Sequence, residues 1–93
     1  MTNKIFHVAC LIYNCEREEI ESTKRTVNLA MARYLMFALL TDAGVKATKV
    51  IECLRRDRVM AYHMSQRVAD LRQVDKDFIK AYDKAKTILS LVQ

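Results

Sequence analysis

The stretch from residue 27 to residue 43 limits most strongly what this chain can fold into. In a helix it is apolar on nearly every face, through Leu29, Ala30, Met31, Tyr34, Leu35, Met36, Phe37, Ala38, Leu39 and Leu40. A helix that is apolar all round has to be buried. We therefore expect it to form the centre of the fold. Arg33, its one basic residue, is expected to point outward toward the preceding loop.

Little in the sequence interrupts helix formation. The chain contains no proline and one glycine, the residues that most often end helices and form turns between strands. Residues that favour helix, such as Leu, Ala, Lys, Arg, Glu and Met, are abundant. A length of 93 residues suits one domain. We predict an all-α, single compact helical domain over residues 1–93, with about five to six helices.

Two helical segments are predicted before the central helix. Residues 3–13 carry apolar side chains at spacings of three and four, which place them on one face of a helix. The acidic segment 15–21 is expected to form a short turn of helix, anchored by Ile20. Residues 22–26 are polar throughout, so we expect a basic loop.

Three more helices are predicted after the central one, which Gly44 is expected to end. Residues 47–54 form a short helix, and a longer one runs from about 57 to 72. The buried face of the longer helix is predicted to consist of Ala61, Met64, Val68 and Leu71. Asp75 is expected to cap a last helix that ends near residue 91.

Positive charge is concentrated in the middle of the chain. Residues 22–67 contain nine basic and three acidic residues, a net charge of +6, whereas the two ends contain seven and eight, a net charge of −1. The whole chain carries +5. Such a local excess is typical of a surface that binds phosphate.

The sequence Arg55-Arg56-Asp57-Arg58 stands at the expected start of the helix 57–72. The positive end of a helix dipole disfavours cations. An anion such as a phosphate would therefore compensate for three arginines at this place. A short helix, 47–54, stands directly before the helix 57–72, and this arrangement predicts a helix-turn-helix. The basic residues would then open its recognition helix, whose first residues contact DNA. Asp57 would interact with the dipole or accept a hydrogen bond from a cytosine amino group. The alternative is a solvated helix start with incidental charge.

Further residues are predicted to contact DNA from around this motif. Basic loops beside a DNA-binding helix often enter the minor groove or contact phosphate. A solvated loop is the alternative for these lysine and arginine side chains. The DNA-binding residues predicted in addition to the cluster at 55–58 and Arg33 are Lys24, Arg25, Lys46, Lys49, Val59 and His63.

Enzymatic and metal-binding functions find no support in the sequence. His7 and His63 have no partner in a catalytic arrangement, and no glycine-rich phosphate loop is present. The three cysteines lack the spacing of a zinc site, and reduced thiols suit the cytoplasm. The apolar segment at the start is too short to span a bilayer. We expect no catalytic residues, no metal, no cofactor and no membrane contact.

Over essentially its whole length, the chain resembles the C-terminal (domain IV) DNA-binding domain of DnaA, the bacterial replication initiator. Residues 5–20 resemble the entry helix and short turn of that domain, and Ser22-Thr23-Lys24-Arg25 resembles its basic loop. Residues 32–39 resemble its alanine-arginine-glutamine helix. Arg56-Asp57-Arg58 resembles the arginine-aspartate-histidine signature that opens the recognition helix. The resemblance implies a helix-turn-helix of the Trp-repressor type.

The resemblance also implies roles for individual residues. Arg25 matches the loop arginine that enters the minor groove, and Arg33 matches an arginine that contacts phosphate. Arg56 and Asp57 match the first two residues of the signature, which face the DNA.

Four residues depart from the pattern of that family at the turn that contacts bases. Arg58 replaces a histidine, and Val59 and Met60 replace a pair of threonines. Arg55 lies near the place of two glycines that normally precede the signature. The usual initiator site is therefore not the expected target, although Val59 could contact a thymine methyl group.

The predicted function is double-stranded DNA binding through a helix-turn-helix and a basic loop. It would serve replication or transcription regulation, without ATPase activity, in a cytoplasmic protein associated with the nucleoid. The alternative is a protein-interaction module on the same scaffold that has lost sequence-specific DNA binding. Its partner would belong to a replication or transcription complex and would contact an apolar patch of Val59, Met60 and Tyr62. No particular oligomeric state is predicted.

Overall fold

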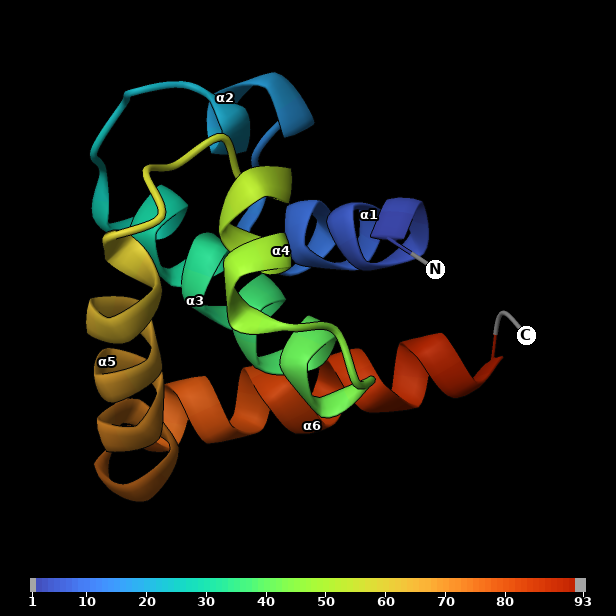
Figure 1. Cartoon of the computed structure of the whole chain (residues 1–93). Helices are drawn as coiled ribbons and strands as arrows, with labels where there is room; N and C mark the ends of the chain where they lie inside the picture. The colour runs from blue at the N-terminus through green and yellow to red at the C-terminus, as the bar shows by residue number, and fades with distance from the viewer. Residues whose placement is uncertain (1, 92–93) are drawn as a thin grey trace.

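The computed structural model describes residues 2–91 of the chain. These residues form six α-helices joined by short connections (Figure 1). The all-α prediction is confirmed. The helices are α1 (Thr2–Tyr13), α2 (Arg17–Glu21), α3 (Val27–Asp42), α4 (Ala47–Cys53), α5 (Met60–Val74) and α6 (Lys76–Leu91). None of the described helices is long and apolar enough to cross a membrane.

Helix α3 lies at the centre and packs against the other five helices (Figure 1). Nine of its residues are buried, among them Leu35, Met36 and Leu40 with no measurable exposure. The sequence contains apolar residues on nearly all faces of this helix because neighbours cover it on nearly all sides. The predicted central helix is confirmed.

Gly44 ends α3 as predicted. Its φ of 97° lies in the left-handed region that glycine adopts without steric cost. The backbone N–H of Val45 donates to the carbonyl of Leu40 at 3.0 Å, and that of Gly44 donates to Thr41 at 3.0 Å. These two bonds form a Schellman motif, which satisfies carbonyls that the helix end would leave without partners.

Helix α5 begins at Met60, three residues later than predicted. Arg55 has a φ of 56°, which breaks the right-handed path after α4. The carbonyl of Asp57 then accepts a hydrogen bond from the N–H of Met60 at 2.9 Å, in a turn that leads into the helix. The cluster at 55–58 therefore forms the connection between two helices, and its prediction as the first turn of a helix was wrong.

The core-facing side of α5 and the start of α6 agree with the sequence analysis. Met64, Val68 and Leu71 are buried at the predicted spacing, and Ala61, the fourth residue of the predicted face, is half-buried against the core. The side chain of Asp75 accepts a hydrogen bond from the N–H of Phe78 at 2.9 Å, which caps the first turn of α6.

Asp42, Arg72 and Tyr82 join the end of α3 to α5 and α6. Arg72 donates two hydrogen bonds to the Asp42 carboxylate, at 3.1 and 2.7 Å, and the Tyr82 hydroxyl donates a third. The Arg72 guanidinium also lies over the Tyr82 ring, 4.7 Å from its centre. The hydrogen bonds from Arg72, chiefly, hold the pKa of Asp42 below its usual value.

We predict that Asp42→Asn destabilises the fold in a pH-dependent way. A carboxyl whose pKa is lower in the folded state contributes stability above its unfolded pKa, and that stability is lost as the pH falls. The substitution should lower the free energy of unfolding by about 1 kcal/mol at pH 7. The difference should begin to shrink as the pH falls below about 4 and should be lost as the pH passes the lower pKa of the folded state. Urea unfolding across this range measures it.

Asp83→Asn is the matched control, because Asp83 is exposed and its carboxylate makes no ion pair with residues 2–91. It should leave the free energy of unfolding nearly unchanged. An Asp42→Asn loss of the same size at pH 3 and pH 7 would contradict the account.

Candidate nucleic-acid interface

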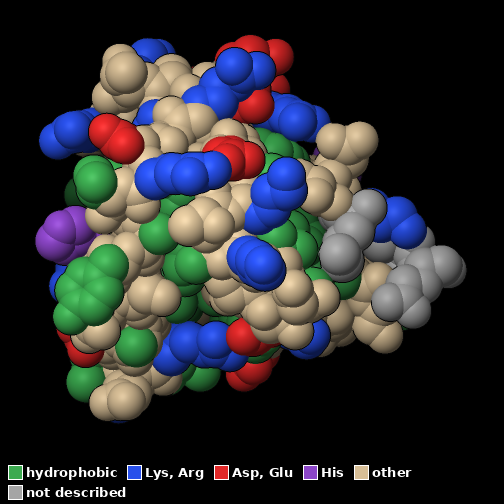
Figure 2. All heavy atoms as spheres, viewed as in Figure 1, with side chains coloured by type: hydrophobic (Ala, Val, Ile, Leu, Met, Phe, Trp, Pro, Cys, Tyr) green, Lys and Arg blue, Asp and Glu red, His purple; other side chains and the backbone are tan. Residues whose placement is uncertain are grey.

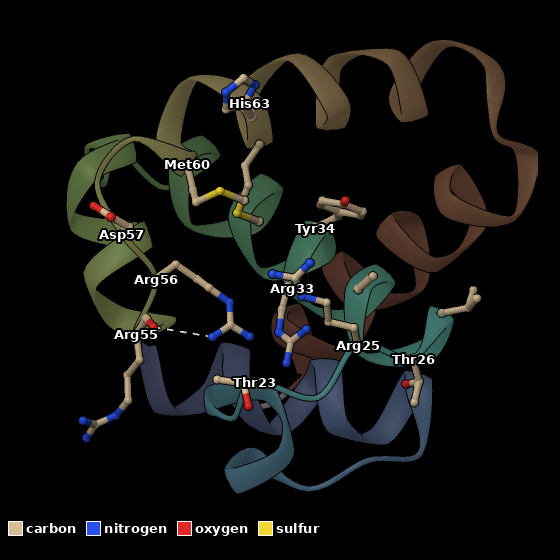
Figure 3. Close-up of a pocket in the computed structure, with 13 residues that line it drawn as sticks. Thr23, Arg25, Thr26, Arg33, Tyr34, Arg55, Arg56, Asp57, Met60 and His63 are labelled. Atoms are coloured by element: carbon tan, nitrogen blue, oxygen red, sulfur yellow. Dashed lines mark hydrogen bonds between the residues drawn. The ribbon is translucent and has the colours of Figure 1, made fainter.

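A groove with a volume of about 630 Å³ lies between the basic loop, α3 and the start of α5 (Figure 3). Six of the predicted DNA-binding residues line it, although they come from segments up to 38 positions apart in the sequence. These six are Arg25, Arg33, Arg55, Arg56, Asp57 and His63. Five lie elsewhere: Lys24, Lys46, Lys49, Arg58 and Val59.

Arg33 is buried, with 7% of its surface exposed, and does not point outward as predicted. Its Nε donates to the carbonyl of Ile20 at 2.9 Å, and its Nη2 donates to Glu19 and Ser22, both at 3.1 Å. Glu19 and Ile20 belong to the last turn of α2, where helix carbonyls lack partners within the helix; that of Glu19 also accepts from the N–H and the hydroxyl of Ser22. Burial is therefore offset by hydrogen bonds that attach α2 and the basic loop to α3.

Arg56 attaches the α4–α5 connection to the same loop. Its Nη2 donates to the carbonyl of Ser22, 34 positions earlier, and its Nη1 donates to the carbonyl of Arg55 at 3.4 Å. The Ser22 carbonyl therefore accepts hydrogen bonds from both Arg33 and Arg56. As a result, the basic loop is held beside the start of α5.

Arg25, Arg33 and Arg56 extend toward one another in the groove, and none of them forms an ion pair with a carboxylate of residues 2–91 (Figure 3). Burial and then the charge of Arg56 lower the pKa of Arg33. Burial and then the charge of Arg25 lower the pKa of Arg56. Like charges at such close quarters repel, so the groove favours an anion as its ligand.

The other basic residues of this region are neutralised in part by acidic neighbours. Lys24 pairs with Glu19 at 3.7 Å. Glu52 pairs with Lys49 at 4.0 Å and with Arg58 at 3.3 Å. Pairs this exposed contribute little to stability, so a phosphate can replace the carboxylate at small cost.

Arg55 and Asp57 line the groove but direct their charged groups away from its centre (Figure 3). The Nε of Arg55 lies 3.5 Å from the Glu21 carboxylate. Val59 and His63 are exposed near the start of α5, and Lys46 is exposed directly before α4. Of these three residues, His63 alone lines the groove, and Lys46 lies at the end of α4 opposite the α4–α5 connection.

Apolar side chains form much of the groove, and the sequence analysis did not predict them as site residues. Val27, Ala30 and Tyr34 recur at spacings of three and four, which places them on one face of α3. Met60 and Met64 face them from α5. The α3 spacing was visible in the sequence. The position of α5 opposite this face of α3 was not visible in the sequence, because it depends on the path of the α4–α5 connection.

Figure 2 shows how charged and apolar side chains divide one face of the molecule. Lys and Arg side chains gather over its upper half, around α2, α4 and the α4–α5 connection, where some acidic side chains lie among them. Hydrophobic side chains are exposed at the left edge, over α5. A basic surface therefore adjoins an apolar one at the start of α5.

In comparisons with known proteins, no protein-family model matches the chain and no curated protein matches its sequence. The resemblance to the DnaA domain accordingly stays a prediction. The function has to be argued from the geometry and charge of the groove.

We predict that Arg33→Met destabilises the fold by about 3 kcal/mol, because three carbonyls lose a charged donor. Arg25→Met is the matched control. Arg25 is exposed and makes no hydrogen bond or ion pair with residues 2–91, so its loss should cost less than about 0.5 kcal/mol. Urea unfolding distinguishes the two variants. Equal losses would show that Arg33 does not hold α2 and the loop in place.

The backbone of Arg55 leads to a second stability prediction. A left-handed conformation costs an L-residue about 1 kcal/mol, and glycine avoids this cost. Arg55→Gly and Arg55→Ala both remove the ion pair with Glu21, so their difference isolates the backbone term. The glycine variant should be more stable than the alanine variant by about 1 kcal/mol. An alanine variant of equal or greater stability would contradict the positive φ.

Proposed function

We propose that this protein binds double-stranded DNA, with α4 and α5 acting as a helix-turn-helix and the basic loop as a second contact. The observation that carries the proposal is the convergence of Arg25, Arg33 and Arg56 without a carboxylate partner among residues 2–91. Phosphate is the anion that a basic surface of this kind most commonly binds.

The three arginines have different parts in the proposal. Arg33 makes three hydrogen bonds to carbonyls and Arg56 makes two, so they chiefly position the loop and add positive potential. Arg25 is exposed on the loop and is the direct contact. Lys46 and Lys49 of the α4 region extend the basic surface to the phosphates on the other side of α5.

Base contacts are assigned to the exposed residues before and within the first turns of α5. Asp57 is exposed and pairs with no cation of residues 2–91, so its carboxylate can accept a hydrogen bond from a cytosine amino group. Val59, which is 69% exposed, can contact a thymine methyl group. His63 lies one turn further along the helix.

The conformation of Arg55 supports the resemblance to the DnaA domain. That family has glycines near this place, and Arg55 adopts the positive φ that glycine favours. We propose a role in the regulation of replication or transcription, at a DNA sequence other than the usual initiator site. Arg58, Val59 and Met60 are the residues that would change the target.

Arg25→Ala should weaken binding to a random duplex on the order of tenfold. It should also reduce by about one the slope of the logarithm of the binding constant against the logarithm of the salt concentration. The reason is the loss of a phosphate contact and its counterion release. Fluorescence anisotropy at several salt concentrations measures both quantities. Lys84→Ala is the control, because Lys84 is an exposed cation on α6 outside the groove. Absence of duplex binding at low salt, or equal losses for the two variants, would contradict the proposal.

A protein-interaction module is the second candidate, favoured by the apolar surface on α5. Val59 and Tyr62 are 69% and 68% exposed, and Met60 adjoins them at 38%. Exposed apolar side chains that adjoin one another are typical of interaction sites. Capture from a nuclease-treated lysate tests it. A partner that is retained without nucleic acid and lost in Tyr62→Ser favours this candidate.

A further inference from the structure

The groove has an apolar component that phosphate binding does not require. Besides the arginines, it is lined by Val27, Ala30, Tyr34, Met60 and Met64. A phosphodiester is bound by cations and by N–H and O–H donors, without need of apolar side chains. The apolar side chains therefore indicate a ligand with a flat or apolar part next to its negative charge.

Tyr34 is the side chain in the groove best suited to such a ligand. It is half-buried on α3, directly after Arg33. Its hydroxyl makes no hydrogen bond with residues 2–91, and its ring pairs with no other ring or arginine there. Tyr82 and Tyr62, by contrast, contact Arg72 and His63 respectively. Figure 3 shows the Tyr34 ring beside the converging arginines.

The size of the groove suits a single nucleotide. Its volume of about 630 Å³ lies within the range typical of small-ligand sites. Bases in a duplex are paired and stacked, so a base reaches the floor of a groove only when it is unpaired. Proteins that bind single strands combine a basic groove with aromatic side chains in the same way.

We propose that the groove binds one unpaired nucleotide, with its phosphate at Arg25, Arg33 and Arg56 and its base against Tyr34 and Met60. The inference rests on the proposed nucleic-acid function for the attraction of phosphate, and it adds a base-binding site. Arg33 contributes through Nη1, because its Nε and Nη2 donate to carbonyls. Met60 is 38% exposed, and its flexible thioether can adapt to any base.

The test compares a labelled dT oligonucleotide with an abasic oligonucleotide of the same length, which has the same phosphates but no bases. Fluorescence anisotropy with the full chain should show the dT strand binding about tenfold more tightly, as one stacked base contributes. Tyr34→Leu should remove this difference, whereas Tyr62→Leu should keep it, because Tyr62 lies outside the groove. Equal affinity for the two strands would overturn the proposal.

A second variant and a second measurement guard against misfolding of Tyr34→Leu. Met60→Ala alters an exposed side chain and should reduce the difference between the two strands severalfold. In the unaltered protein, the methyl resonances of Met60 and Met64 should shift with the dT strand and not with the abasic one. Identical methyl shifts with both strands would contradict base binding.

Two further arms identify the source of the nucleotide and separate this inference from the proposed function. Displacement of the dT strand by dTMP identifies a free nucleotide as a ligand. Displacement by an unlabelled oligonucleotide but not by dTMP identifies a single strand as the ligand. Both outcomes support the site. A duplex that binds while dT and abasic strands bind equally sinks the groove inference alone. Base-dependent strand binding without duplex binding sinks the double-stranded function alone.

Discussion

The carbonyl oxygen of Ser22 is the contact on which the basic surface of this protein depends. It accepts hydrogen bonds from Arg33 in the central helix and from Arg56 in the α4–α5 connection. Three segments distant in the sequence therefore meet at one acceptor. This acceptor fixes the start of the basic loop beside the α4–α5 connection, and the Thr26 cap of α3 fixes its end.

This arrangement assigns structural and binding roles to neighbouring arginines. Arg33 satisfies the end of α2, and its hydrogen bonds offset the cost of burying a cation. Arg56 holds the α4–α5 connection against the basic loop. Arg25 is exposed, and we propose it as the residue that contacts a ligand. Because the charges of all three act at the same place, the residues that hold the groove together also make it attractive to anions.

Much of the fold could be predicted from the sequence, because its signals are local. The apolar surface of α3, the glycine after it and the spacing of Met64, Val68 and Leu71 each depend on neighbouring residues alone. Local periodicity failed at the start of α5, because Arg55 ends α4 in a left-handed conformation and a turn at Asp57 delays the next helix to Met60. It failed at Arg33 because a lone charge is expected to face solvent, and three carbonyls hold it inside. The groove around Tyr34 needed the three-dimensional fold, since α5 supplies one wall.

In the proposed complex, Arg25 contacts nucleic-acid phosphate while Arg33 holds the loop. Side-chain ¹H–¹⁵N NMR of the arginine Nε groups, recorded as a short duplex is added at low salt, tests it most directly. The account predicts a large shift at Arg25 and a small one at Arg33, whose Nε is bonded to Ile20. Arg72, bonded to Asp42 away from the groove, should not move. Binding that leaves Arg25 unchanged, or shifts Arg72 as much, would contradict the account.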